Sequence, residues 1–169
     1  MHNVQFHIDD AQNLSNIHSN SVEVLINIES AFHYPDKPAF LKEVHRVLKP
    51  GGQYLIADIL STRKKREGLM KLWGKTMVYH FWNKKQYEEE FLKSELVINY
   101  SEDITQHVKK GWSIYRKWIP KIKRELFLQN VVYKIFYTIN ARINIYFLTR
   151  QQYVIYVGSK PHINIVGLN

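Results

Sequence analysis

The sequence predicts an α/β fold built on a parallel sheet, and three neighbouring segments carry this prediction. Val22–Ile28 is a short run rich in β-branched side chains, which is typical of a strand. An amphipathic helix is expected next. Gln53–Ile59 is a second short apolar run, and it directly follows Pro50-Gly51-Gly52. Strand, helix and strand in this order predict a right-handed βαβ unit over Val22–Ile59.

The helix of this unit is predicted from its ends and from the spacing of its apolar residues. Asp36 has the side chain of an N-cap, and Pro38 suits the first turn. Apolar residues recur at steps of three and four, which places them on one face: Phe40, Leu41, Val44, Val47 and Leu48. Pro50 cannot continue a helix, and Gly51 can adopt the left-handed conformation that closes one. The helix is therefore expected to end there.

The flanking regions hold weaker signals. A strand is predicted at Val4–Ile8, ending at Asp9-Asp10. The back half is predicted to contain, in order, a helical stretch from about Glu67 to Lys93, a strand at Leu96–Tyr100, helices through Thr105–Thr149 broken near Pro120, and a strand at Tyr153–Val157. In such sheets ligands bind beyond the carboxyl ends of the strands, so Asp58 and the residues after Ile28 are the first site candidates.

Composition sets wider bounds. The 169 residues, 45% of them hydrophobic, suffice for one domain over 1–169. There is no cysteine, which excludes disulfides and thiolate chemistry, and His2, His7 and His18 are too scattered to suggest a metal site. No signal peptide or run of about 18 uncharged apolar residues is seen. We expect a cytoplasmic protein, with peripheral membrane contact as an open alternative.

Positive charge is concentrated in the back half. Residues 1–60 hold four Lys and Arg against seven acids, whereas residues 61–169 hold twenty against eight. The cations gather at Arg63–Arg66 and over Lys109–Arg124, where Trp112, Tyr115 and Trp118 interleave with them. Contact with RNA or an anionic membrane has to be weighed. Nucleic-acid binding is the less favoured, because a charge run is more often a solvated face.

A later stripe of apolar residues recurs at helical spacing: Phe136, Ile139, Ile143 and Phe147. Polar residues separate them, so the segment is predicted to be an amphipathic helix. The favoured interpretation is a helix that packs on the sheet. The alternative is a lid over an apolar acceptor that also contacts lipid.

Three segments together resemble a known family: Asp10–Leu14, Ser21–Ser30 and Phe40–Gly52. They are similar to class I S-adenosylmethionine-dependent methyltransferases, and within them to the group acting on sterols, tocopherols and phenolic lipids. The Glu-Ser-x-x-His-x-Pro-Asp pattern over Glu29–Asp36 supports that group. The resemblance is strong over Val4–Ile59. It implies a Rossmann-like fold, the cofactor S-adenosylmethionine, and a small-molecule acceptor.

The resemblance also implies roles for individual residues. Asp10 would accept a hydrogen bond from the adenine amino group, with the Ala11 backbone beside the ring. The methionine part of the cofactor would lie against Asn27, Ile28, Glu29 and Ser30. The acceptor side would include His33, Tyr34 and Asp58, with His33 as the candidate base. Structural alternatives stay open: a turn residue for Asp10, a loop histidine for His33, and a cap for Asp58.

The chain departs from the family pattern where the cofactor's other half would bind. No G-x-G occurs in the first fifty residues, and the family's first two strands have no counterpart. Glu95 stands where the family often has glycine. We therefore expect an incomplete, N-terminally truncated fold, with a cofactor-side core at 1–60 and acceptor-side helices and strands at 61–169. Val4–Ile8 would pair with Val22–Ile28, join another chain, or fray.

Three functions are consistent with these observations. The first is a methyltransferase, or a fragment of one, that modifies a small lipid-like or phenolic acceptor. The second is an inactive remnant that serves as a scaffold or subunit, complemented by another chain that carries the Gly-rich half; an oligomer stays open as well. The third is a basic module that binds RNA or anionic lipid. Binding of S-adenosylmethionine by this chain alone is expected to be weak.

Overall fold

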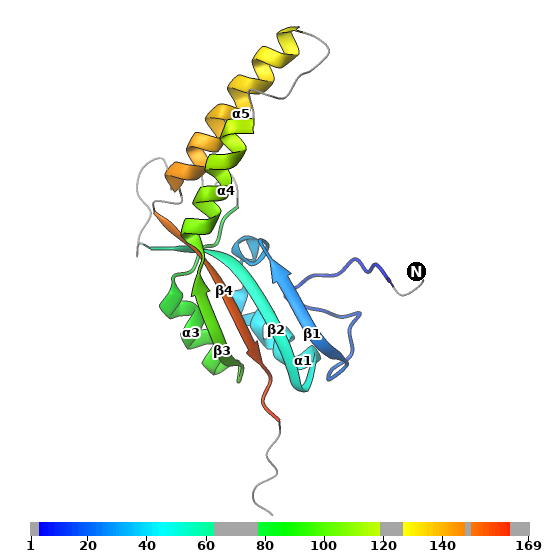
Figure 1. Cartoon of the computed structure of the whole chain (residues 1–169). Helices are drawn as coiled ribbons and strands as arrows, with labels where there is room; N and C mark the ends of the chain where they lie inside the picture. The colour runs from blue at the N-terminus through cyan, green and yellow to red at the C-terminus, as the bar shows by residue number, and fades with distance from the viewer. Residues whose placement is uncertain (1–3, 63–77, 119–126, 148–149, 163–169) are drawn as a thin grey trace, which may run out of the picture.

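The computed structural model describes residues 4–62, 78–118, 127–147 and 150–162. At its centre is a four-stranded sheet with the order β1-β2-β4-β3 (Figure 1). The strands are β1 (Val22–Ile28), β2 (Leu48–Ser61), β3 (Val97–Asp103) and β4 (Gln151–Ser159). β1 and β2 are parallel, whereas β4 lies antiparallel to both of its neighbours. The α/β class is confirmed, with a sheet that is mixed rather than purely parallel.

The predicted βαβ unit is present, and its helix begins as expected. α1 (Lys37–Val47) joins β1 to β2, and the Asp36 carboxylate accepts a hydrogen bond from the Ala39 backbone N–H at 3.0 Å. This bond satisfies one of the donors that a helix start leaves unpaired. The predicted apolar face is buried: Phe40, Leu41, Val44, Val47 and Leu48.

The end of α1 differs from the prediction. The helix ends at Val47, and Leu48 is already extended, with its N–H donating to the Val44 carbonyl. Gly51 does have a left-handed φ of 78°, but it lies inside β2, at an irregularity where the pairing with β1 shifts. Its N–H donates to the Lys160 carbonyl at 2.9 Å. The assignment of Gly51 as the helix terminator was therefore wrong, because the glycine serves a bulge instead.

One face of the sheet carries the core. α1 and α3 (Lys84–Lys93) both lie behind the sheet in Figure 1, against the alternate residues of β2 and β4 that point that way. The largest buried side chains there are Tyr54, Ile56, Leu60, Tyr87, Phe91 and Tyr156. On the opposite face, β1 exposes three large apolar residues, namely Val24, Ile26 and Ile28. Among the described residues, no helix packs over β1 on that face.

Residues 4–8 do not form the predicted strand. They have no regular secondary structure, and Val4, Phe6 and Ile8 are exposed. Of the three expected fates, pairing with β1 is not seen, and the segment lies unpaired in this chain. Asn16 holds the end of this segment: its side-chain amide donates to the Ile8 carbonyl at 3.3 Å, and its N–H donates to the Asp9 carboxylate at 2.8 Å. The strand prediction failed because an apolar alternation alone does not fix which strand a segment pairs with, and the free edge of β1 is not used by residues 4–8.

Of the helical stretch predicted from Glu67 to Lys93, the structure describes residues 78–93, and within them the helix is α3. Residues 63–77, which include the basic run Arg63–Arg66, lie outside the described residues. Val78–Asn83 is not helical. α3 begins at Lys84 because Asn83 and Gln86 form a reciprocal capping box. The strands predicted at Leu96–Tyr100 and Tyr153–Val157 are confirmed as β3 and β4, with shifted ends.

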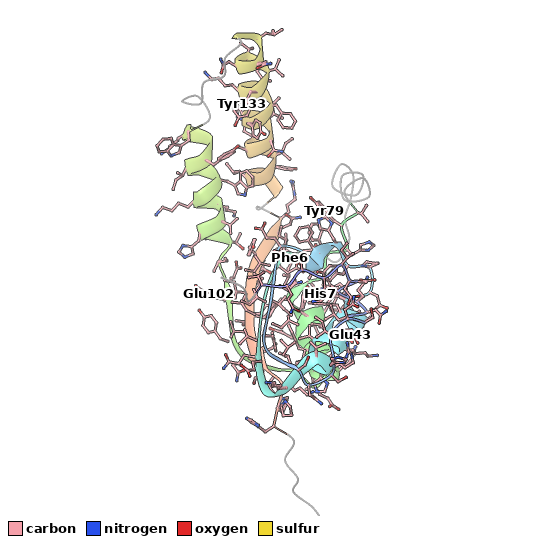
Figure 2. All side chains as sticks on the ribbon, turned by 90° about the vertical axis from the view of Figure 1, so that its right-hand side faces the viewer. Phe6, His7, Glu43, Tyr79, Glu102 and Tyr133 are labelled. Carbon is pink, nitrogen blue, oxygen red and sulfur yellow. The ribbon has the colours of Figure 1, made fainter. Side chains whose placement is uncertain are left out.

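α4 (Thr105–Trp118) and α5 (Phe127–Phe147) confirm the two helices predicted around Pro120, which itself lies outside the described residues. They run side by side and project from one end of the sheet (Figures 1 and 2). Phe136 and Ile139 are 60% and 53% exposed, so the prediction that this stripe packs on the sheet was wrong. Of the helices that the structure describes, none combines the length and apolar character needed to cross a bilayer.

Glu95→Gly is expected to raise the free energy of unfolding by up to about 1 kcal/mol, because Glu95 has a left-handed φ of 56° that glycine adopts without steric cost. Little is lost in exchange, since the contact of Glu95 with His45 is 3.9 Å long and its side chain is 80% exposed. Urea denaturation measures the change. Glu89→Gly inside α3 is the control and should destabilise the fold; a lower midpoint for Glu95→Gly would contradict the explanation.

Candidate functional site

The candidate site lies at the carboxyl end of β1, where a strained residue begins the loop. Glu29 has a left-handed φ of 52°, unusual for a side chain of its kind. Its N–H donates to the Ala57 carbonyl of β2 at 2.9 Å. Its carboxylate accepts a hydrogen bond from the hydroxyl of Tyr153 on β4. Burial is the main cause that raises the pKa of Tyr153, and this hydrogen bond raises it further. Glu29 is thus held by two neighbouring strands.

Three of the predicted residues form one hydrogen-bonded chain beside Glu29. The Asn27 amide donates to the Tyr34 hydroxyl at 3.0 Å, and that hydroxyl donates to the Ser30 hydroxyl at 3.1 Å. Asn27 Oδ1 is buried and accepts no hydrogen bond in this structure. A buried carbonyl oxygen without a donor is costly, so this atom is suited to accept one from a ligand.

Asp10 is brought to the same end of the sheet by its neighbour Gln12. The Gln12 side-chain oxygen accepts from the Asp36 N–H at 2.6 Å, which ties the turn at Asp10 to the start of α1. Asp10 itself is exposed, and its carboxylate accepts from the Gln12 N–H at 2.9 Å. Ala11 packs against the core. The turn residue therefore presents a carboxylate at the rim on which β1 ends.

Arg46 fixes the chain that follows this turn. Its guanidinium donates to the carbonyls of Leu14 at 2.8 Å and Ile17 at 2.9 Å, and pairs with Glu43 at 2.7 Å. Glu43 in turn accepts from the Leu14 N–H at 2.8 Å. The hydrogen bond from Arg46 is the main cause that lowers the pKa of Glu43. Residues 14–17 are thus bound along α1, which limits where the Asp10 turn can lie.

Asp58 lies beneath the rim. Its carboxylate is fully buried on the helix-covered face, where it accepts from the Phe32 N–H at 3.0 Å and from the Tyr87 hydroxyl. Burial raises its pKa to about 6, although the hydrogen bond from Tyr87 and the charge of Lys37 oppose that shift. Phe32 belongs to the short helix η1 (Ala31–His33), so Asp58 supports the loop from below.

His33 sits at the end of η1 in an aromatic cluster. It is exposed, and its ring centroid lies 4.3 Å from that of Phe32 and 5.2 Å from that of Tyr79. Phe81 completes the cluster through Phe32 and Tyr79. The His80 N–H donates to the Phe32 carbonyl at 2.7 Å, which holds this segment over η1. Figure 2 marks Tyr79 near this end of the sheet.

Sequence reasoning missed several residues that build this rim. Tyr79 and Phe81 were hidden inside a predicted helix, and Tyr153 was taken only as a strand residue. Lys37, which was not considered, is fully buried and donates to the His80 carbonyl. The one available signal was the density of aromatic residues over Tyr79–Trp82.

The oxygens of this rim suit a ligand that carries donors and positive charge. Asp10 and Glu29 supply carboxylates, and Asn27 supplies an unpaired carbonyl oxygen. These groups fit the adenine amino group and the sulfonium of S-adenosylmethionine. The cofactor's own carboxylate needs N–H donors instead, and the first glycine of the sequence is Gly51. The residues present therefore fit one half of the cofactor.

Comparisons with known proteins find methyltransferases that are similar to this chain. Residues 1–56 match a family described as "Methyltransferase domain". A 61-residue segment, 36% of the chain, is 44% identical to phthiotriol/phenolphthiotriol dimycocerosates methyltransferase of Mycobacterium leprae. A 74-residue segment, 44% of the chain, is 38% identical to 2-methyl-6-phytyl-1,4-hydroquinone methyltransferase of Synechocystis.

A solved structure supports the fold beyond the matched sequence. Phosphoethanolamine N-methyltransferase 2 of Haemonchus contortus, in complex with S-adenosyl-L-methionine, superimposes on 90% of the chain with a TM-score of 0.79 and 19% identity. The comparison covers 36% of that protein, and the two sequence matches cover 22% and 23% of theirs. The chain thus spans well under two thirds of these relatives.

Proposed function

Residues 1–56 carry a methyltransferase-family sequence, and the chain has the fold of class I S-adenosylmethionine-dependent methyltransferases. From this premise we propose that the chain forms part of an enzyme that methylates a small phenolic or lipid-like molecule, with residues 1–60 on the cofactor side and residues 61–169 on the acceptor side. The observation that carries this proposal is the strained Glu29, held at the carboxyl end of β1 beside Asn27 and on the rim to which Gln12 ties Asp10.

Each rim residue has a proposed part in binding. Asp10 accepts a hydrogen bond from the adenine amino group, and the Ala11 backbone lies beside the ring. Asn27 Oδ1 accepts a hydrogen bond from a donor group of the cofactor. Ile28 and Ser30 line the methionine part of the cofactor, and the Glu29 carboxylate faces its positively charged sulfur. When bound, S-adenosylmethionine supplies an already activated methyl group, so the protein mainly has to align the reactants and exclude water.

The acceptor is proposed to approach over η1. The names of the two relatives describe methylation of phthiotriols and phenolphthiotriols and of a phytyl hydroquinone. A phenol-like hydroxyl has to lose a proton, and the exposed imidazole of His33 is the proposed base. The cluster of Phe32, Tyr79 and Phe81 offers ring contacts, with Tyr34 nearby on the loop. Asp58 acts as a positioning residue, because it holds the Phe32 N–H. An acceptor with a long hydrocarbon chain would be methylated at a membrane surface.

A further polypeptide segment is proposed to complete the site. β1 is an edge strand, and its exposed apolar face includes Val24, Ile26 and Ile28. Parallel strands are normally covered on both faces, and an exposed apolar edge strand readily pairs with a further strand. We propose that the complementing segment adds a strand at β1 and a glycine-bearing turn for the cofactor's carboxylate. The described residues alone would then bind the cofactor weakly.

Amide NMR of the chain, titrated into the millimolar range, tests the proposal with two probes. S-adenosylhomocysteine should shift Asp10–Gln12 and Asn27–Ser30, and Asp10→Asn should weaken its binding about 10-fold, because one charge-assisted hydrogen bond is lost. Glu29→Gln should weaken S-adenosylmethionine more than S-adenosylhomocysteine, since only the former carries the positive sulfur.

Glu23→Gln is the matched control for both substitutions. Glu23 is an exposed carboxylate at the opposite end of β1, paired with Lys49 at 2.7 Å, and its loss should leave both titrations unchanged. Shifts confined to α4 and α5, or equal weakening by all three variants, would contradict the proposed site.

A further inference from the structure

The helical arm, defined as α4 and α5, is the least explained part of the molecule. The two helices pack on each other through aromatic residues, with Tyr115 and Tyr137 in edge contact at 6.5 Å between ring centroids. Between them lies a hollow of about 450 Å³, lined by Val108, Gly111, Trp112, Tyr115, Tyr137 and Asn140. Figures 1 and 2 show the arm extending away from the sheet. One face of α5 therefore packs against α4.

The outer face of α5, defined by five of its exposed apolar residues, carries a continuous apolar surface. It consists of Leu128, Val132, Ile135, Phe136 and Ile139, which follow helical spacing and are 53% to 72% exposed. Single exposed apolar residues are ordinary, but a contiguous patch of this kind marks an interaction surface. It extends roughly 17 Å along the helix axis, at 1.5 Å per residue.

Charge indicates what this surface meets. α4 and α5 together carry Lys109, Lys110, Arg116, Lys117, Lys134 and Arg142 and no Asp or Glu. Over Thr105–Arg150 there are ten Lys and Arg against one acid, while the rest of the chain is balanced at fourteen of each. All of the chain's excess positive charge therefore belongs to the arm and its loops, and a partner of negative charge is favoured.

The combination of exposed aliphatic and cationic residues helps to choose among three partners: a nucleic acid, a second copy of the chain and an anionic membrane. Leucine, valine and isoleucine gain nothing from stacking on nucleobases, which favours aromatic side chains. A second copy would bring the same positive charge against the arm. An anionic bilayer satisfies both features, because acyl chains take up the apolar face and headgroups bind the cations. We propose that the arm lies on the surface of an anionic membrane with the outer face of α5 inserted.

The arm is joined to the sheet at the end where the candidate site lies. α4 begins directly after β3, and β4 begins soon after α5. The Ile104 N–H donates to the Tyr153 carbonyl, and the Tyr153 N–H donates to the Thr105 hydroxyl, both at 2.8 Å. Tyr153 also binds Glu29 at the rim. A membrane held by the arm would therefore face the rim, although the membrane proposal itself does not depend on methyl transfer.

Co-sedimentation of the full chain with vesicles tests this proposal. Binding to phosphatidylcholine vesicles containing one quarter phosphatidylglycerol should exceed binding to pure phosphatidylcholine by at least ~10-fold, and should fall as salt rises. Ile135→Asp with Ile139→Asp should lower binding to the anionic vesicles at least ~10-fold, because two charges would enter the apolar region. Lys109→Glu with Lys110→Glu should lower it by a similar factor.

Leu92→Asp is the matched control, because Leu92 is 78% exposed on α3, away from the arm. It should bind like the unchanged chain, and circular dichroism of every variant should show unchanged helix content. Equal binding to both kinds of vesicle, or no effect of the double aspartate variant, would overturn the proposal. Two other results would overturn it. One is a dimer, seen by light scattering, that the double aspartate variant dissociates while the unchanged chain does not bind vesicles. The other is binding of RNA without binding of vesicles.

Discussion

Gly158→Ala is expected to lower the free energy of unfolding by about 3 kcal/mol, because the added methyl group has no space. A Cβ at this position of β4 would collide with the Val97 carbonyl oxygen and with the ring and hydroxyl of Tyr54. Tyr54 is buried, and its hydroxyl donates to that same carbonyl at 3.1 Å. Neither neighbour is the free end of a flexible chain. Urea denaturation followed by far-ultraviolet circular dichroism measures the loss.

Gly111→Ala provides the matched control. A Cβ at Gly111 in α4 has no atom within 4 Å, and alanine is the better helix former by about 1 kcal/mol. This variant should therefore keep or raise the stability of the chain. If the two alanine variants behaved alike, the packing of Tyr54 across β4 onto Val97 would be wrong.

Asp58 is expected to make the protein more stable as the pH falls from about 7 to 4. Burial raises the pKa of Asp58 to about 6 in the folded protein, against 3.8 for an ordinary carboxyl. Between these values the folded protein binds a proton that the unfolded chain does not, so acidification favours the folded state. The difference corresponds to about 3 kcal/mol, at 1.36 kcal/mol for each pH unit.

Asp58→Asn isolates this contribution. Asparagine keeps an oxygen for the Phe32 N–H and cannot titrate, so the stability of the variant should lack this rise on acidification. The measurement is the free energy of unfolding in urea at several pH values, taken as the difference between the two proteins, because the other carboxyls then cancel. Tyr87→Phe removes the donor to the Asp58 carboxylate, so the pKa of Asp58 should go up further and the rise should begin at a higher pH and be larger. Parallel profiles for the unchanged chain and Asp58→Asn would contradict the burial argument.

Local chemistry explains which parts of the fold could be predicted from the sequence. β1 and α1 were correct because their β-branched run, the Asp36 cap and the spacing of Phe40 and Val44 are set by neighbouring residues. The left-handed Gly51 was also recognised, but its role was not. The end of a helix and a β-bulge both need a left-handed residue, so the glycine alone does not tell them apart. Only the pairing of β2 with β1 shows that Gly51 belongs to a bulge.

Distant contacts explain what could not be predicted. The stripe on α5 shows that one face is apolar, but no local rule states whether sheet, helix or another surface meets that face. The alternation at Val4–Ile8 likewise does not state which strand the segment pairs with, and it leaves the free edge of β1 unused. Both errors concern the partner of a segment rather than its own character.

In the candidate site, too, residues marked by local motifs could be predicted and residues brought in by distant contacts could not. Asp10, Asn27 and Glu29 were identified from motifs along the chain, and Gln12 and Asp36 link the turn at Asp10 to that loop. Their functional roles stay predictions. The supporting residues were missed, because they belong to elements far along the chain: Tyr153 contacts Glu29 at the rim, and Tyr87 contacts Asp58 beneath it. Their pattern in the sequence is that of ordinary core residues.

The central position of β4 has a consequence for biosynthesis. β2 and β3 both pair with β4 and not with each other, so the sheet cannot close until residues 151–159 have left the ribosome. Until then the nascent chain exposes the free edges of β2 and β3, which are sites for intermolecular aggregation. Productive folding in the cell should therefore depend on chaperones that shield these edges, more than for a fold whose strands pair in order of synthesis.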